Sequence, residues 1–147
     1  MLRNDTKIKG KEFIMKSHTD LEQSKVLSKI LPLESADMYW YLATKDNPKA
    51  RFNEGYNEYG DFELPCWSLE ALLEAMPKSI PKYIESERCQ KTFHLNLFRS
   101  YHHCCSYSFA PSISDDDGSN TLYCVGRDNW VDACYELILK LHELNLL

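Results

Sequence analysis

Apolar residues recur every three or four positions in three segments of the chain, which is the spacing of an amphipathic helix. The longest segment follows Asp128 and Asn129, either of which can cap a helix with its side-chain oxygen. Ser68 offers the same kind of cap to a shorter segment, which Pro77 ends because proline cannot continue a helix. The pattern therefore predicts three helices, over residues 20–31, 69–76 and 129–144.

Alternation of apolar and polar residues indicates strands instead, because successive side chains of a strand point to opposite faces. Two consecutive segments alternate in this way, at residues 92–99 and 101–109, and residues 121–126 are expected to form a short third strand. Strands that follow one another along the chain usually pair, so an antiparallel meander is expected. Together with the helices, this predicts an α+β fold with a small antiparallel sheet of about three to four strands and helices packed mainly on one face.

The register between the first two of these strands decides which side chains face the helices. A three-residue loop over residues 98–100 pairs Leu97 with Tyr101 and leaves His102 and Cys104 on the outer face of the sheet. A two-residue loop would turn the same two side chains inward. The first register buries more apolar area, and we expect it for that reason.

Residues 45–64 are the most loop-like stretch, because Asn47-Pro48, Gly55 and Gly60 interrupt any regular pattern. Long irregular segments of compact domains are often binding loops, and rigid aromatic side chains dominate the energetics of interfaces. We expect a recognition surface formed by the aromatic residues in and beside this loop, namely Trp40, Phe52, Tyr56, Tyr59 and Trp67. The alternative is that these rings line the core beneath a long loop, and the sequence favours the two interpretations equally.

A cluster of histidine and cysteine at residues 102–105 has side chains that bind soft metal ions. On a strand, His102 and Cys104 share one face, and Cys124 on the next strand or His94 supplies a third ligand. The spacing does not match the C-x2-C or H-x3-H patterns of structural zinc sites, so packing within the sheet is the expected role. The sequence therefore predicts no metal and no cofactor, and His102, Cys104 and Cys124 are the candidates if an ion binds.

Catalytic motifs give no starting point for an enzyme. The chain contains no G-x-S-x-G, H-E-x-x-H, P-loop or G-x-G-x-x-G sequence. Cysteine and histidine can be paired on paper in many ways, so a nucleophilic cysteine is not indicated by pattern alone. No catalytic residue is predicted.

The composition is that of a globular protein, with 44% hydrophobic and 27% charged residues in a chain of 147. No apolar run approaches the roughly 20 residues that cross a bilayer, and the first residues lack the apolar centre of a secretion signal. We therefore expect a cytoplasmic protein with reduced thiols and no membrane contact. The net charge of −5, concentrated after residue 30, disfavours nucleic acid and leaves a protein partner or self-association as the expected interaction.

The first fourteen residues are expected to be a flexible extension without a role in the fold. Residues 10–12 can be encoded by a purine-rich run that resembles a bacterial ribosome-binding site, which would make Met15 the true start. The domain organisation that follows is a single α+β domain over residues 15–147.

Two segments, residues 65–77 and 131–141, resemble motifs of small uncharacterised proteins from Bacteroides-type gut bacteria and their phages or mobile elements. The similarity spans roughly residues 31–147 and rests mostly on helix starts and apolar stripes. Such proteins have no assigned activity, so the resemblance implies a genomic setting and no mechanism.

These observations lead to two hypotheses from different classes. The first is a non-catalytic accessory protein of a phage or mobile element that binds a protein partner or itself through residues 45–64. The alternative is a small enzyme or metal-binding domain that uses the histidine and cysteine residues of the 102–105 strand.

Overall fold

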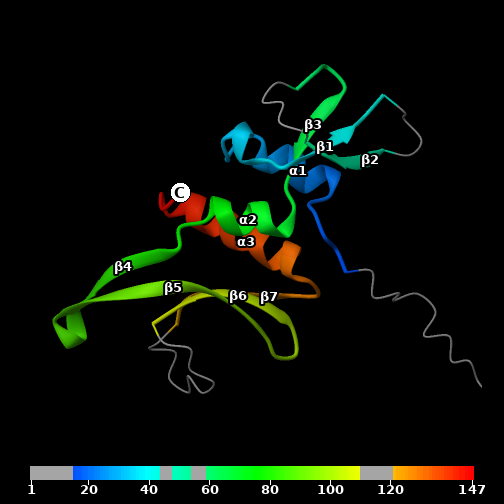
Figure 1. Ribbon diagram of the computed structural model, residues 1–147. Helices are drawn as coiled ribbons and strands as arrows, with labels where there is room; N and C mark the ends of the chain where they lie inside the picture. Colours follow the sequence, from blue (N-terminus) through cyan, green and yellow to red (C-terminus); the bar gives the residue numbers. More distant parts are fainter. Residues whose placement is uncertain (1–14, 44–47, 54–58, 110–120) are drawn as a thin grey trace, which may run out of the picture.

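The computed structural model describes residues 15–43, 48–53, 59–109 and 121–147. Within these ranges the chain forms two antiparallel sheets together with helices (Figure 1). The helices are α1 (Leu21–Leu27), α2 (Leu69–Ala75) and α3 (Trp130–Glu143), and two 3-10 turns are η1 (Leu33–Ser35) and η2 (Glu85–Glu87). The strands are β1 (Met38–Tyr41), β2 (Lys49–Phe52), β3 (Glu63–Cys66), β4 (Ser79–Ile84), β5 (Cys89–Arg99), β6 (His103–Ser108) and β7 (Thr121–Arg127). The predicted α+β class is confirmed.

Helices α2 and α3 begin where the sequence supplies a cap. The Oγ of Ser68 accepts a hydrogen bond from the backbone N–H of Ala71 at 3.2 Å. The Oδ1 of Asn129 accepts one from the backbone N–H of Asp132 at 2.8 Å. Each cap satisfies a donor that the first helical turn leaves without a partner, so the two predicted helices are confirmed with their starts.

Helix α1 has the more complete cap. The Oδ1 of Asp20 accepts from the backbone N–H of Gln23 at 2.8 Å, and the side chain of Gln23 accepts from the backbone N–H of Asp20 at 3.1 Å. This reciprocal pair is a capping box. The helix ends at Leu27, a turn earlier than the predicted Leu31.

The larger sheet has the strand order β4-β5-β6-β7, so each strand pairs with the next one along the chain. The predicted meander of β5, β6 and β7 is confirmed. Strand β4 was not predicted, because Pro81 interrupts its pattern. Proline is tolerated there because β4 lies at the edge of the sheet, where an N–H group is not needed for pairing.

The turn between β5 and β6 has the predicted length, but it covers residues 100–102 instead of 98–100. Leu97 therefore pairs with Cys105 and not with Tyr101, so the predicted register is wrong by four residues. Because the error is an even number, every side chain keeps its predicted face. Cys105 accordingly lies in the core.

The smaller sheet has the order β2-β1-β3 and was not predicted as a sheet. The sequence left a strand or a helical turn open for residues 33–44, and this range contains both η1 and β1. Strands β2 and β3 of this sheet occupy part of the stretch that the sequence favoured as a loop. Each strand has only four residues, which is too short for alternation to stand out, and Pro65 lies within β3. The prediction of an irregular segment over residues 45–64 is therefore wrong for these two strands.

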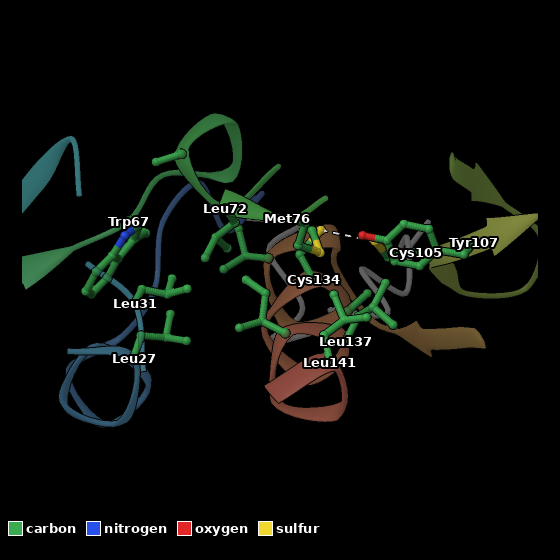
Figure 2. Close-up of a cluster of buried hydrophobic side chains, with 14 of the residues drawn as sticks. Leu27, Leu31, Trp67, Leu72, Met76, Cys105, Tyr107, Cys134, Leu137 and Leu141 are labelled. Atoms are coloured by element: carbon green, nitrogen blue, oxygen red, sulfur yellow. Dashed lines mark hydrogen bonds between the residues drawn. The ribbon is translucent and has the colours of Figure 1, made fainter. Parts of the chain in front are cut away.

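One buried cluster extends from α1 to the larger sheet (Figure 2). The cluster draws side chains from the helices α1, α2 and α3, from β6 and from the segments beside them. The labelled members are Leu27, Leu31, Trp67, Leu72, Met76, Cys105, Tyr107, Cys134, Leu137 and Leu141. None of these residues is more than 6% exposed. Full burial of a large apolar side chain contributes about 1.5–3 kcal/mol, so this cluster holds the helices against the larger sheet.

A helix that crosses a bilayer needs about 20 mostly apolar residues, and the longest helix of the described ranges, α3, has 14. No helix in these ranges is long and apolar enough to cross a membrane.

Candidate functional site

The residues predicted to form a recognition surface lie in different environments. Phe52 is 71% exposed at the end of β2, and Trp40 and Tyr59 are half-buried. Trp67 is fully buried, and Tyr56 lies outside the described residues. The structure therefore brings only part of the predicted set to the surface.

Trp67 is a core residue, and its predicted role as a surface contact is wrong. Its indole Nε1 donates to the Oγ of Ser35 at 2.9 Å, and its ring packs in the buried cluster with Leu72. For Trp67 the alternative interpretation holds, because the ring fills the interior beside the helix that it precedes. The signal was present in the sequence, since Trp67 and Leu72 have the spacing of a hydrophobic staple.

Trp40 is held in place by the segment before α1. Its indole Nε1 donates to the backbone carbonyl of Thr19 at 3.2 Å, and its ring lies 5.4 Å from the ring of His18, centroid to centroid. Burial, and then the charge of Lys16, lower the pKa of His18, which favours the neutral imidazole in this contact. One side of the Trp40 ring is thus fixed by its contacts with Thr19 and His18, and the rest of the half-buried ring is open to solvent.

Tyr59 connects the smaller sheet to η1. Its hydroxyl donates to the backbone carbonyl of Leu33 at 3.3 Å and accepts from the Nδ2 of Asn53 at 3.4 Å. Burial raises the pKa of the Tyr59 phenol, so the hydroxyl keeps its proton at neutral pH. Tyr59 therefore connects Asn53, the residue after β2, to Leu33 of η1.

Strand β2 lies at an edge of the smaller sheet, because among the described residues only β1 pairs with it. Lys49 and Arg51 are exposed and alternate along it, so they share one face. The Cζ of Arg51 lies 5.1 Å from the centroid of the Tyr41 ring, a cation–π contact that orients the guanidinium group. Phe52 lies at the end of the same strand. We call Tyr41, Lys49, Arg51 and Phe52 the β2 edge surface.

The sequence interpretation missed the basic residues of this surface. Lys49 and Arg51 were not considered, because the segment was taken as a loop. The signal that reveals them is the alternation of charged and uncharged side chains over residues 49–52.

The candidate metal ligands are partly separated. His102 lies exposed in the β5–β6 turn, whereas His94 pairs with Ser108 towards the far end of those strands. Cys104 lies on the outer face as predicted, but it is only 7% exposed, and Cys124 on β7 is exposed. No group of three histidine, cysteine or acidic side chains that could hold a metal ion occurs in the described part of the chain.

The cysteines are all within the described ranges, and all six are free thiols. Burial of the sulfur, and then the neighbouring thiol of Cys104, raise the pKa of Cys124. In the core, the Sγ atoms of Cys105 and Cys134 lie 3.5 Å apart, a contact that Figure 2 shows, and this contact together with burial raises the pKa of Cys105. A thiol with a raised pKa is a poor nucleophile at neutral pH, because the thiolate is the reactive form.

No protein-family model, curated protein or solved structure matches this chain. The resemblance of residues 65–77 and 131–141 to proteins of gut bacteria and their phages stays a prediction.

Proposed function

We propose that the protein is a non-catalytic accessory protein that binds an acidic segment of a protein partner along the β2 edge surface. The observation that carries the proposal is the combination, on one edge strand, of an exposed phenylalanine with two exposed basic side chains. Residues 45–64 were expected to contain the binding surface, and β2 lies within them.

An edge strand supports binding through its backbone. Its outward N–H and C=O groups can pair with an added strand, which is how many domains recognise extended peptides. Natural edges often carry lysine to prevent unwanted pairing, and Lys49 serves that purpose here. The same positive charges would attract a partner strand that carries acidic side chains.

Charge indicates the kind of partner. The whole chain has a net charge of −5, so Lys49 and Arg51 form a local basic site on an acidic protein. Complementary charges at an interface raise the association rate and exclude wrong partners. Phe52 adds an apolar anchor on the opposite face of the same edge strand, and such aromatic residues carry much of the energy of interfaces.

Self-association through the same edge has less support. Antiparallel pairing of β2 with β2 of a second copy would bring Lys49 of one copy close to Arg51 of the other. Like charges that face each other across a strand pair are destabilising. An acidic partner relieves this repulsion, and a second copy of this chain does not.

The alternative function, a small enzyme or metal-binding domain, has less support from the described residues. His102 and Cys104 adjoin each other, but no group of three ligands that could hold a metal ion occurs among the described residues, and burial raises the pKa of the Cys124 thiol. The genomic setting in a phage or mobile element, and the cytoplasmic location, are part of this proposal and rest on the sequence resemblance and composition.

The proposal is tested by affinity capture from a lysate of the source organism, with variants of equal fold. Arg51→Glu and Phe52→Ser should each lose a partner that the wild type retains. Tyr83→Ser is the matched control, because Tyr83 is a 59% exposed aromatic residue on an edge strand of the larger sheet.

A peptide copied from the acidic segment of the captured partner should then bind the wild type at least about tenfold more tightly than Arg51→Glu, a difference of about 1.4 kcal/mol. Equal capture by the wild type and both β2 variants would contradict the proposal. So would a captured partner whose binding segment is basic or neutral.

A further inference from the structure

A cavity of about 310 Å³ lies where the β5–β6 turn meets the start of α3. Arg99 and His103, which pair with each other at the ends of β5 and β6, lie on one side of it. Trp130, the first residue of α3, lies on another, and Leu69 and Met15 complete the apolar lining. The volume is at the lower end of the range of about 300–1000 Å³ that is typical of small-molecule sites.

Two aromatic rings that contact each other form one wall of the cavity. The rings of His103 and Trp130 meet edge to face, with centroids 4.7 Å apart and an angle of 85° between their planes. This is a favoured geometry for aromatic pairs. With Leu69 and Met15 nearby, the wall fits a flat apolar group.

Two polar groups of the cavity make no hydrogen bond or ion pair with the part of the chain that the structure describes. Arg99 forms no ion pair in the described parts of the chain. The indole Nε1 of Trp130 is buried, and no acceptor among the described residues contacts it. A buried donor without an acceptor destabilises a protein by about 1–3 kcal/mol, so its persistence in a cavity wall calls for an explanation.

The other cation of the cavity is already engaged. The Nζ of Lys16 contacts the Oδ1 of Asp132 at 2.7 Å, the Oε1 of Gln23 at 2.8 Å and the Oδ2 of Asp20 at 3.1 Å. Arg99 is therefore the cation that a ligand would meet. Asp128, also in the lining, adds one negative charge and disfavours a ligand with two.

From these contacts we propose that the cavity binds a small aromatic monocarboxylate. The carboxylate pairs with the guanidinium group of Arg99, and the ring packs against Trp130, Leu69 and Met15. The positive end of the α3 dipole adds a smaller attraction to the same charge. This site is separate from the β2 edge surface, and the proposal does not depend on the protein partner.

The test uses three carboxylates of graded ring size, namely benzoate, phenylacetate and indole-3-acetate, titrated into the full chain. Binding is followed by the ¹H–¹⁵N resonances of the backbone and of the indole N–H groups. At least one probe should bind saturably below about 10 mM and shift the indole N–H of Trp130. The corresponding neutral amide should bind about tenfold more weakly, because it loses the charge-assisted contact with Arg99.

Two arginine variants of the same kind separate the site from a general charge effect. Arg99→Gln should weaken binding of the carboxylate about tenfold, and Arg88→Gln, in the turn between β4 and β5, should leave it unchanged. Both side chains are exposed, and unchanged resonances elsewhere verify that each variant is folded. The proposal is overturned if no probe binds, if acid and amide bind equally, or if Arg99→Gln binds as the wild type does. Inorganic phosphate in place of the carboxylate should leave the Trp130 resonance unshifted, and a saturable shift would assign the cavity to dianions instead.

Discussion

The two sheets of this protein differ in how their apolar side chains are used. In the larger sheet, Cys105 and Tyr107 are fully buried against the helices, and α3 contributes Leu137 from the other side of the contact. In the smaller sheet, Phe52 is 71% exposed, and Phe62, in the turn just before β3, is 60% exposed. Figure 1 shows the smaller sheet beside α1 and apart from the layer formed by α3 and the larger sheet.

This difference indicates that the buried residues of the larger sheet serve stability and that the exposed residues of the smaller sheet are available for binding. One face of the larger sheet packs against α3, so the buried residues of that face stabilise the fold, while Tyr83 and Phe98 of the same sheet stay exposed. The smaller sheet commits Met38 and Cys66 to the interior and leaves an edge strand with an exposed ring. Exposed apolar groups that the fold does not need are the ones that a partner can use.

The comparison is tested most strongly by truncating one apolar residue in each region. Leu137→Ala should lower the free energy of unfolding by about 3 kcal/mol, because it removes a buried side chain and leaves a cavity. Phe52→Ala removes a larger side chain but should change the free energy by no more than about 0.5 kcal/mol. Urea unfolding at neutral pH measures both, and equal losses would show that the smaller sheet is as important to stability as the larger one.

A second prediction concerns the connection between the smaller sheet and α2. The carboxylate of Asp37 accepts hydrogen bonds from the backbone N–H of Ser68, at 2.9 Å, and from the Ser68 hydroxyl. Asp37→Ala should therefore lower the free energy of unfolding by about 2 kcal/mol, since it leaves two partly buried donors without an acceptor and loosens the cap of α2. Glu63→Ala is the matched control. The Glu63 carboxylate accepts from the backbone N–H of Gly60 at an exposed site, and its loss should change stability by less than about 0.5 kcal/mol.

Features that depend on neighbouring residues could be predicted from the sequence, and features that depend on distant contacts could not. The starts of α2 and α3 depend on Ser68 and Asn129, which cap the helix a few residues away, so a short window of sequence contains the whole signal. The faces of β5 and β6 were predicted because a period of two survives any even error in register. The register itself was wrong, since the position of a turn depends on the pairing of the complete strands.

The smaller sheet and the candidate site depended on distant contacts. Strands β2 and β3 pair with β1 and not with each other, and no short stretch of sequence predicts this strand order. Trp67 illustrates the limit for single residues, because its place beside an aromatic-rich stretch suggested exposure while its position before α2 required burial. The cavity joins Met15, Leu69, Arg99 and Trp130, which only the folded chain brings together.

The smallest predicted effect concerns Asp132, which ties α3 to the segment that leads into α1. Its Oδ1 accepts from the Nζ of Lys16 at 2.7 Å and from the Nε2 of Gln23 at 2.8 Å, and its Oδ2 accepts from the Nδ2 of Asn129 at 2.8 Å. Burial by itself would raise the pKa of Asp132, but these hydrogen bonds and the charge of Lys16 outweigh it and lower the pKa. The contribution of Asp132 to stability is therefore present at neutral pH and is lost as the pH falls through the lowered folded-state pKa.

Asp132→Asn should lower the free energy of unfolding at pH 7 by about 1 kcal/mol, since the site is partly exposed to solvent. The difference between wild type and variant should shrink below about pH 4, where the unfolded carboxyl becomes protonated. Asp128→Asn should show neither effect, because Asp128 is exposed and makes no ion pair within the described residues. Urea unfolding at several pH values gives the comparison, and a difference that stays constant from pH 7 to pH 3 would show that the geometry of the hydrogen bonds, and not the charge of Asp132, holds α1 to α3.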